Sequence, residues 1–383
     1  MSFRTTISWL LLPLTMWYAV GVAVRNFLFA LGIKRQQAPH ITTIGVGNLA
    51  TGGTGKTPHV EYLLDMLSEK YSTAVLSRGY MRKSKGFMLD DGSHDAAMLG
   101  DESAMLAARH PQVQVAVCEK RVEGVKRLME LTAEAEQPNG DSGTVSSDTS
   151  SDTSDTKKAP EIIILDDVFQ HRYIKPSINI LLTEYRHPYY KDYILPYGNL
   201  REFRSARRHA GIVVVTKCPA RLNPIEKHNI IHDLKLENYQ KVFFSYLRYD
   251  AITTLDGKPT DIDLHRLEHV LAVTGIAHPE PMIEEIKRSC KVQHLSFADH
   301  HDYTRRDVQR IADAFNALSG TRKIILTTEK DAPRLRGLTA DLPVYTLPVK
   351  VAFHQNSDTN FDRLIESSVR ENISFLNKLN IWS

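Results

Sequence analysis

At 383 residues the chain is longer than one typical domain, so we expect two α/β domains of unequal size. Its apolar fraction of 42% and charged fraction of 24% are those of a globular protein, which excludes wholesale disorder. The net charge of +3 is too small to argue for nucleic acid as a partner, and the three scattered cysteines exclude a paired zinc or redox motif, so we expect a reducing compartment.

An uncharged, mostly apolar run occupies residues 7–24 near the N-terminus. A cleaved signal peptide would have a shorter apolar core, and a spanning helix is at its lower length limit here and is interrupted by Pro13. An interfacial helix fits better, because its aromatic residues can lie at headgroup depth while Arg25 and Lys34 meet anionic lipid. A buried apolar helix is the simpler alternative. We expect residues 1–35 to form a membrane-associated helix.

The next part of the chain, residues 36–225, alternates short apolar runs with helical patterns. The expected strands cover residues 41–46, 73–76, 113–117, 161–165, 178–182 and 212–216. Strands of this kind, separated by helices, predict a parallel sheet covered on both faces. Residues 136–160 break the pattern, because they are rich in Ser, Thr and Asp and lack apolar periodicity. We expect a disordered insertion there, without chemistry.

The strand and helix pattern restarts near residue 225, and we expect a smaller α/β domain over residues 226–350. Its expected strands cover residues 242–246, 270–273, 324–327 and 344–347, with helices at 281–288 and 305–318. Residues 351–383 then form a helical C-terminal segment, for which packing on the first domain is one arrangement.

A glycine-rich stretch directly follows the first expected strand. It has the spacing of a P-loop and consists of Ala50, Thr51, Gly52, Gly53, Thr54, Gly55, Lys56 and Thr57, with Ala50 in place of the usual first glycine. In such a loop, backbone N–H groups converge on the phosphates of a nucleotide. The lysine neutralises those phosphates, and the hydroxyl residue ligates Mg²⁺. The flanking strand and helix supply the context that this motif needs.

Two acidic pairs are placed where a phosphate site needs them. Asp166 and Asp167 follow the strand at 161–165, so they lie at the end of the sheet where one can hold Mg²⁺ and the other can orient the nucleophile. Asp101 and Glu102 begin a helix, where a carboxylate stays ionised and can act as a base or a metal ligand. An Asp at this position is also an ordinary N-cap.

The remaining motifs narrow the class of protein. The run Asp299-His300-His301 offers a histidine that can take a proton near neutral pH. The Asn/Thr-Lys-x-Asp loop of guanine-specific proteins is absent, as is the signature of transporter ATPases, so neither class is favoured.

Together these motifs resemble one family, the tetraacyldisaccharide 4'-kinases, which phosphorylate the lipid A precursor. The matching stretches are residues 45–58, 76–80, 100–102, 165–172, 195–202, 214–219, 272–282, 297–303 and 327–335. They follow the family order over most of the chain, and the apolar N-terminus also fits. The resemblance implies transfer of the γ-phosphate of ATP, with Mg²⁺, to the 4'-hydroxyl of a tetraacyldisaccharide 1-phosphate. It also implies a membrane lipid substrate, no nucleic acid, and a place on the cytoplasmic face of the bacterial inner membrane.

The resemblance also implies roles for individual residues. Asp101 would be the catalytic base, His300 its partner, and Asp167 a further catalytic residue. Asp166 and Asp167 both resemble the metal-site acids of the family. The Mg²⁺ ligands would be Thr57, Asp166 and Glu102. The substrate would be contacted by Arg201, Glu202, Asn48 and Arg78. Two departures from the family pattern, Val168 where a glycine is common and the insertion at 136–160, touch none of these groups.

Two other functions would use the same loop differently. A membrane-attached ATPase switch would hydrolyse ATP without a lipid acceptor. A binding module with a degenerate nucleotide site would not turn over at all, and the intact Lys56 and Thr57 and the paired acids argue against it. A requirement for a lipid acceptor separates the kinase from the switch.

Overall fold

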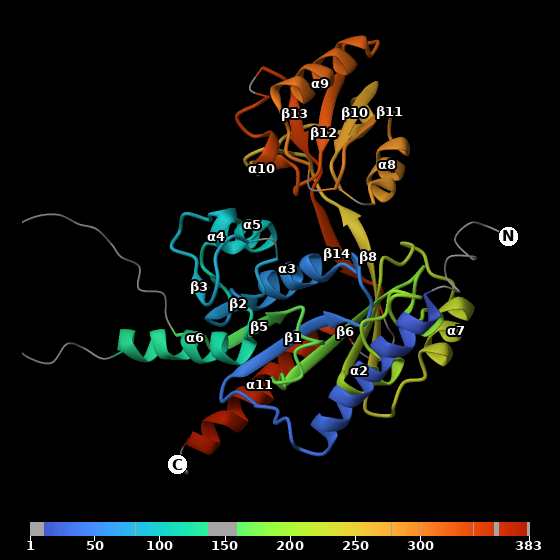
Figure 1. Cartoon of the computed structure of the whole chain (residues 1–383). Helices are drawn as coiled ribbons and strands as arrows, with labels where there is room; N and C mark the ends of the chain where they lie inside the picture. Colours follow the sequence, from blue (N-terminus) through green and yellow to red (C-terminus); the bar gives the residue numbers. More distant parts are fainter. Residues whose placement is uncertain are drawn as a thin grey trace, which may run out of the picture. The chain divides into compact units, whose positions relative to one another are not determined.

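The structure is a computed structural model of the chain (Figure 1). The residues that it describes are 11–80, 82–136, 159–276, 278–299, 301–339, 341–355 and 360–380. The chain divides into two compact units, which we call unit 1, Met1–Tyr246 with Val351–Ser383, and unit 2, Leu247–Lys350. Most of the expected insertion, residues 137–158, and the expected catalytic partner His300 lie outside the described residues.

Unit 1 is built on a large sheet. Its described strands are β1 Thr42–Asn48, β2 Thr73–Ser77, β3 Met88–Leu89, β4 Gln114–Val117, β5 Ile162–Asp166, β6 Ile178–Glu184, β7 Ile212–Thr216, β8 Lys241–Tyr249 and β14 Val349–Phe353. They lie in the order β14-β8-β7-β6-β1-β5-β2-β4-β3. Every neighbouring pair from β8 to β4 is parallel, and β3 adds to β4 in the antiparallel sense. The expected parallel sheet is therefore confirmed.

Helices cover both faces of this sheet, as apolar strands buried on both sides require. The described helices of unit 1 are α2 Leu12–Ala30, α3 Lys56–Leu67, α4 Ala96–Leu99, α5 Asp101–Arg109, α6 Arg121–Glu136, α7 Pro224–Leu234 and α11 Phe361–Asn380, with 3₁₀ turns η1 Tyr189–Lys191 and η2 Arg204–His209. Residues of α3, α5 and α11 share one core with Ile44 and Val46 of β1. Residues of α6 and α7 pack in two cores with other strand side chains, such as Leu165 and Val213.

Two glycines in β1 allow the chain after β5 to pass close to the sheet. A side chain at Gly47 would place its Cβ 2.9 Å from the backbone nitrogen of Phe169, and one at Gly45 would meet Val168 at 2.7 Å. Such contacts are too short for real Cβ atoms, so only glycine fits. The loop that carries Asp167 is thereby packed directly beside the end of β1.

Unit 2 has a smaller sheet of its own. Its described strands are β9 Thr253–Thr254, β10 His269–Thr274, β11 Lys291–Ser296, β12 Lys323–Thr327 and β13 Val344–Thr346, in the order β11-β10-β12-β13-β9. Its described helices are α8 Glu280–Lys287, α9 Arg305–Ala317 and α10 Ala332–Leu335, with the 3₁₀ turn η3 Leu264–Arg266. Strands β11, β10, β12 and β13 are parallel, and β9 adds in the antiparallel sense. Helices α8 and α9 contribute to two separate cores. Unit 2 is the second, smaller α/β domain that the sequence predicts.

The expected boundary between the domains at residue 226 is wrong. Helix α7 and strand β8 belong to unit 1, because β8 pairs in parallel with β7 and the helix residues Ile230 and Leu234 pack against Val213. The restart of the pattern near residue 225 is thus one more strand-helix-strand repeat of the same sheet. Helix α11 packs on unit 1, where Ile365 and Val369 are fully buried.

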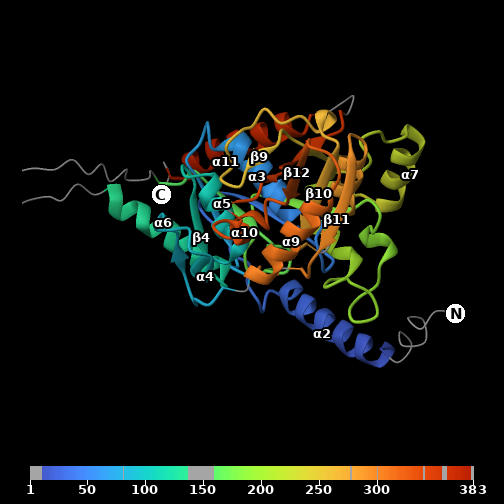
Figure 2. The same cartoon turned by 90° about the horizontal axis from the view of Figure 1, so that it is seen from above.

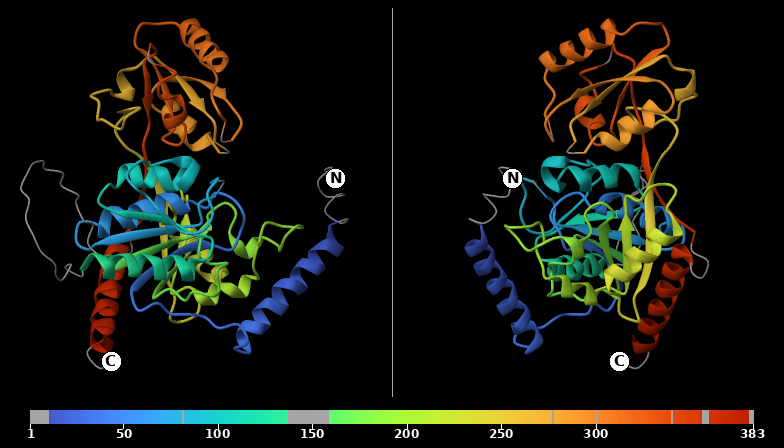
Figure 3. Two further views of the ribbon diagram at one scale, coloured as in Figure 1. Left: turned by 60° about the vertical axis from the view of Figure 1, so that its left-hand side comes forward. Right: turned by 90° about the vertical axis from the view of Figure 1, so that its right-hand side faces the viewer.

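Helix α2 lies outside the layers of the sheet, on the surface of unit 1 (Figures 2 and 3). Within the described part of the chain it is the one helix long and apolar enough to cross a membrane, and 17% of its apolar window is buried. Val22 is its one fully buried residue, whereas Trp17 and Met16 on its outer side are 77% and 70% exposed. The expected apolar N-terminal helix is present.

Candidate active site

The phosphate loop connects β1 to α3, as the motif requires. Gly52 and Gly55 have φ angles of 103° and 87°, in the left-handed region that favours glycine. Gly55 stands at the N-cap of α3, so Lys56 and Thr57 form the first turn of the helix. The backbone N–H groups of a helix start carry partial positive charge and suit a phosphate. The loop therefore has the conformation and the dipole of a phosphate cradle.

Side chains from neighbouring elements fix the inside of this loop. Asn48 is fully buried and donates from Nδ2 to the Thr54 hydroxyl at 2.9 Å, and Thr216 of β7 donates to the Thr54 carbonyl oxygen, also at 2.9 Å. His59 donates from Nδ1 to the Gly55 carbonyl oxygen at 2.7 Å, and its Nε2 accepts from the Ser245 hydroxyl at 2.9 Å. Burial lowers the pKa of His59 to about 4, so the ring stays neutral.

A second segment holds the outside of the loop. Residues 199–202 run past residues 49–51, with an antiparallel bridge between Ala50 and Leu200. The Thr51 N–H donates to the Asn199 carbonyl oxygen at 2.8 Å, and the backbone of Arg201 donates to the loop at the same distance. The start of the phosphate loop is therefore ordered by a segment that is distant in sequence.

Two cations flank one carboxylate beside this loop. Lys56 Nζ lies 3.6 Å from Asp167 Oδ1, and the Arg201 guanidinium lies 3.5 Å from Asp167 Oδ2. Arg201 also donates to the Gln170 side chain at 3.0 Å. All three charged side chains are between 19% and 33% exposed, so solvent and a ligand can reach them. Two positive charges therefore lie next to the loop that is expected to bind phosphate oxygens.

The oxygen ligands expected for Mg²⁺ lie near one another. The Thr57 hydroxyl donates to Glu102 Oε2 at 2.8 Å. Asp166 is buried, and its Oδ1 makes no hydrogen bond among the described residues. Burial, with Glu102 and Asp167 as negative neighbours, raises the pKa of Asp166 to about 6. A buried carboxylate oxygen without a partner, beside a hydroxyl and a second carboxylate, suits a hard cation.

These residues would not enclose a metal by themselves. In the described part of the chain, no group of three or more His, Cys, Asp or Glu side chains is arranged to hold a metal ion. A magnesium ion here would therefore take part of its shell from phosphate oxygens and water, which is the usual way in which Mg²⁺ is bound with nucleotides.

A buried arginine that the sequence analysis did not single out is bonded to the backbone of the acid pair. Arg121 is 2% exposed and donates to the carbonyl oxygens of Cys118 and Asp166 at 2.6 and 2.7 Å. Burial lowers its pKa to about 10, while the charges of Asp166 and Asp167 act in the opposite direction. Burial and the nearby Arg121 lower the pKa of His171 to about 4. Neither residue belongs to a short motif with a known mechanism, so spacing could not single them out.

The other expected site residues differ in how exposed they are. Asp101 is exposed at the first turn of α5, after Gly100, and next to Glu102. Arg78 is exposed after the end of β2. Glu202 is 1% exposed and is engaged by α2, through an ion pair with Arg25. The first two are therefore accessible to a ligand, whereas Glu202 is occupied within the protein.

The carboxyl end of the sheet in unit 2 carries the residues on either side of His300. The ring of His301 lies 3.1 Å from Asp307 Oδ2, which also accepts from the backbone and the hydroxyl of Thr304 at 2.9 and 2.7 Å. These bonds, together with the stacking of His301 on Phe297, fix the loop that follows His300.

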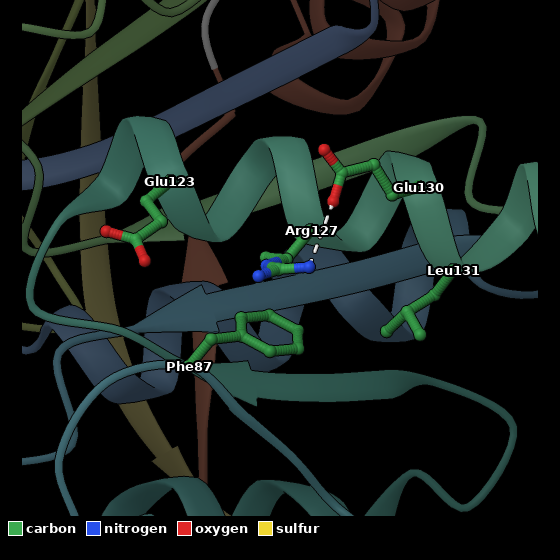
Figure 4. A pocket seen from close by; sticks show the side chains of 5 residues that line it. All are labelled: Phe87, Glu123, Arg127, Glu130 and Leu131. Carbon is green, nitrogen blue, oxygen red and sulfur yellow. Dashed lines mark hydrogen bonds and ion pairs between the residues drawn. The ribbon is translucent and has the colours of Figure 1, made fainter.

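A surface pocket elsewhere in unit 1 has no part in this chemistry (Figure 4). It is lined by Phe87, Glu123, Arg127, Glu130 and Leu131, mostly from α6. Its charged groups include Arg127 and Glu130, which pair with each other at 3.3 Å and are each about 60% exposed. None of the expected site residues lines it, so we assign it no role.

A strand, a phosphate loop, a helix and an acid pair after the neighbouring strand define the class of P-loop nucleotide-binding proteins. The chain matches the family model described as tetraacyldisaccharide-1-P 4'-kinase over residues 7–370. It belongs to this family, as the sequence motifs predict.

Relatives agree with this assignment over almost the whole chain. A tetraacyldisaccharide 4'-kinase of Bacteroides thetaiotaomicron is 38% identical over 378 residues, covering 94% of this chain and 93% of that protein. One of Flavobacterium johnsoniae is 39% identical over 366 residues, covering 95% and 98%. Among solved structures, the "apo" form of LpxK from Aquifex aeolicus in complex with ATP is similar with a TM-score of 0.69 and 28% identity. That match covers 96% of this chain and all of the other.

Proposed function

We propose that this protein transfers the γ-phosphate of ATP to the 4'-hydroxyl of a tetraacyldisaccharide 1-phosphate, a step of lipid A biosynthesis. Besides the family membership, one observation in this chain supports the proposal. The phosphate loop brings Lys56 to 3.6 Å from Asp167, and Thr57 to 2.8 Å from Glu102. Cations for the phosphates and oxygen ligands for a metal thus converge at one loop.

The phosphate loop, Lys56 and Arg201 are the proposed ATP-binding groups. Residues 50–57 would hold the phosphates by their backbone N–H groups, and the two cations would stabilise charge on the transferring group. Asp167, between Lys56 and Arg201, would keep both cations in position. Phosphoryl transfer needs little covalent help, so such positioning accounts for most of what the protein does.

Thr57, Glu102 and Asp166 are the residues that would hold Mg²⁺. When bound, the ion supplies positive charge that neutralises phosphate oxygens. The oxygen-only donor set and the unpartnered buried Oδ1 of Asp166 support this proposal.

Asp101 is the proposed general base, with His300 as its partner. The base would take the proton of the sugar hydroxyl as that oxygen attacks phosphorus, and the histidine would support the charge state of the base. The exposure of Asp101 at a helix start, next to the proposed metal ligand Glu102, supports this role. Arg78 is a proposed contact of the acceptor, as is Arg201 in addition to its proposed place at the phosphates, and Asn48 shapes the loop through Thr54.

Membrane association through α2 is the last part of the proposal. The helix contacts unit 1 from Thr15, whose hydroxyl accepts from the Tyr197 backbone, to Phe29, whose ring packs on Tyr173. Because these lateral contacts extend along the helix, we propose that it lies in the membrane surface and does not cross it. Its exposed apolar side would enter the lipid, and the proposed location is the cytoplasmic face of the inner membrane, within reach of an acylated acceptor.

The test is ATP turnover on vesicles with and without the tetraacyldisaccharide 1-phosphate. We expect ADP formation to depend on the acceptor and to match the phosphorylated product mole for mole. ADP formation at the same rate without the acceptor would favour the ATPase switch instead.

A further inference from the structure

The inner side of α2 is bonded to the segment that carries Arg201. Tyr18 donates from its hydroxyl to the Arg201 carbonyl oxygen at 3.1 Å. Arg25 forms an ion pair with Glu202 Oε1, and Asn26 donates from Nδ2 to Glu202 Oε2 at 3.3 Å. Both carboxylate oxygens of Glu202 are therefore bound by α2. A carboxylate used in this way is poorly placed to contact a substrate.

The same segment holds the phosphate loop. We call residues 199–202 the strap. The Arg201 N–H donates to the Leu49 carbonyl oxygen at 2.8 Å, and the Thr51 N–H donates to the Asn199 carbonyl oxygen at 2.8 Å. The strap therefore has α2 on one side and the start of the phosphate loop on the other. A displacement of the strap would move both the loop backbone and the Arg201 side chain.

A second connection runs through the loop after β5. Arg172 donates to Asn26 Oδ1 at 2.8 Å, and its guanidinium lies 4.9 Å from the ring centre of Phe29. The same loop carries Asp167 and Gln170, the two side chains that face the Arg201 guanidinium. Helix α2 thus holds both loops that present charged groups to the phosphates.

Burial makes the contact between Arg25 and Glu202 obligatory for this arrangement. The Glu202 side chain is 2% exposed, and a buried carboxylate without a partner is strongly disfavoured. The two residues are 177 positions apart, so no local structure requires them to meet. If α2 leaves its seat, Glu202 loses both of its partners and the strap is no longer held from that side.

The outer side of α2 indicates what kind of surface the helix binds. Exposed apolar side chains recur along this side, among them Met16, Val20, Val24 and Phe27, each more than half exposed. A bilayer surface would hold the helix by these groups while its inner side stays bonded to unit 1.

We propose that Arg25 and Glu202 are positioning residues that couple the seating of α2 on the membrane to the geometry of the phosphate loop. The kinetic part of this inference rests on the proposed kinase activity. Its structural part does not, because the strap is held whether or not an acceptor is present. Turnover is then fast only when the membrane-bound helix holds the strap in place.

The test compares Arg25→Met with Arg35→Met on phosphatidylcholine vesicles that contain phosphatidylglycerol and the acceptor. Both substitutions remove one positive charge from the same part of the chain. Arg35, however, is exposed beyond the end of α2, and the ion pair with Glu202 is made by Arg25. We expect Arg25→Met to lower kcat by about 10-fold or more, as misplacement of reacting groups does. We expect equal vesicle binding for the two variants and an unchanged kcat for Arg35→Met. Glu202→Gln should behave like Arg25→Met, and Arg25→Lys should recover most of the turnover.

Hydrogen exchange on the same vesicles gives a readout that does not depend on the acceptor. We expect faster exchange of the amides of residues 49–51 and 199–202 in Arg25→Met than in Arg35→Met, with the central strands unchanged. A kcat and an exchange pattern equal to those of Arg35→Met would overturn the coupling. If the wild-type protein transfers no phosphate but the exchange difference is present, the proposed function fails and the coupling stands. If Arg25→Met exchanges faster throughout unit 1 and Arg25→Lys does not recover turnover, the pair serves only folding and the proposal is overturned.

Discussion

Both units are built on a mainly parallel sheet, but the loops at the carboxyl ends of their strands differ. In unit 1 the loop after β1 is glycine-rich, Asp167 after β5 faces a lysine and an arginine, and Glu102 of α5 accepts from the Thr57 hydroxyl. In unit 2 the acid after β12 is bonded to its own loop and to the loop after β10. Asp331 Oδ2 accepts from the Gly275 N–H at 2.9 Å and from the Thr328 hydroxyl at 2.7 Å, and Oδ1 lies 3.8 Å from Arg334.

The difference shows that the carboxyl edge of a parallel sheet does not by itself make a ligand-binding site. Ligands bind at the carboxyl ends of parallel strands in many folds, yet only loops that leave groups available for a ligand make use of that edge. In unit 1 Asp167 is partly exposed and faces Lys56 and Arg201, whereas in unit 2 Asp331 is fully buried and is bonded to Gly275 and Thr328. Substitutions at the two edges should therefore have different effects.

The largest effect is expected for Lys56→Met in unit 1. Loss of the cation at the phosphates should lower kcat by about 10³-fold, equivalent to about 4 kcal/mol. Steady-state transfer assays measure this loss. Lys70→Met is the matched control, because Lys70 pairs with Glu366 at the surface and lies away from the loop. Equal losses in both variants would contradict the role of Lys56.

The next effect is expected for Asp101→Asn. Removal of the general base should lower kcat by about 10²-fold, with ATP binding retained, because the base acts in the chemical step. Single-turnover transfer and ATP titration separate the two quantities. Asp95→Asn, at the exposed N-cap of α4, should leave turnover unchanged.

His300→Ala should lower kcat in the same direction, and the double variant should lose less than the product of the two single losses. Independent, multiplicative losses would show that the two residues do not act as a pair.

The stability of unit 1 should fall on acidification. The pKa of His59 is about 4 in the folded protein and near 6.5 in the unfolded chain, so the unfolded chain binds the proton first as the pH falls. This residue alone should remove about 2 kcal/mol of unfolding free energy between pH 7 and pH 5. Urea unfolding at several pH values measures this change, with His59→Gln as the comparison. A slope that is the same in both proteins would exclude His59 as the cause.

The smallest effect is expected for Asp331→Asn in unit 2. It weakens the hydrogen bonds to Gly275 and Thr328 and should destabilise that unit by about 1 kcal/mol. ATP binding by unit 1, measured by titration, should not change. A large loss of ATP affinity in Asp331→Asn would remove the contrast between the two edges.

The local parts of the fold could be predicted from the sequence. The strands at residues 73–76 and 212–216 and the helix at 305–318 are found within a residue or two, because apolar periodicity is a local signal. Strand β11 was missed, since four of its six residues are exposed and polar side chains dominate it. The boundary at residue 226 failed because one more repeat of the first sheet resembles the start of a new one.

The site could be predicted only where a motif carries its own geometry. The phosphate loop and the acids at 166–167 have such a motif, and the structure brings them together. Arg121 and His59 have none, because a buried charge or a buried ring has no spacing of its own in the sequence. The pairing of Arg25 with Glu202 joins residues 177 positions apart and follows from the tertiary fold alone.

The product of the reaction tests the central claim most directly. Purified protein, ATP, Mg²⁺ and vesicles with the tetraacyldisaccharide 1-phosphate would be analysed by mass spectrometry and ³¹P NMR. The kinase predicts a lipid heavier by one phosphate, with a new phosphomonoester at the 4' oxygen and one ADP for each product. An unchanged lipid, or ADP formed without it, would contradict the claim.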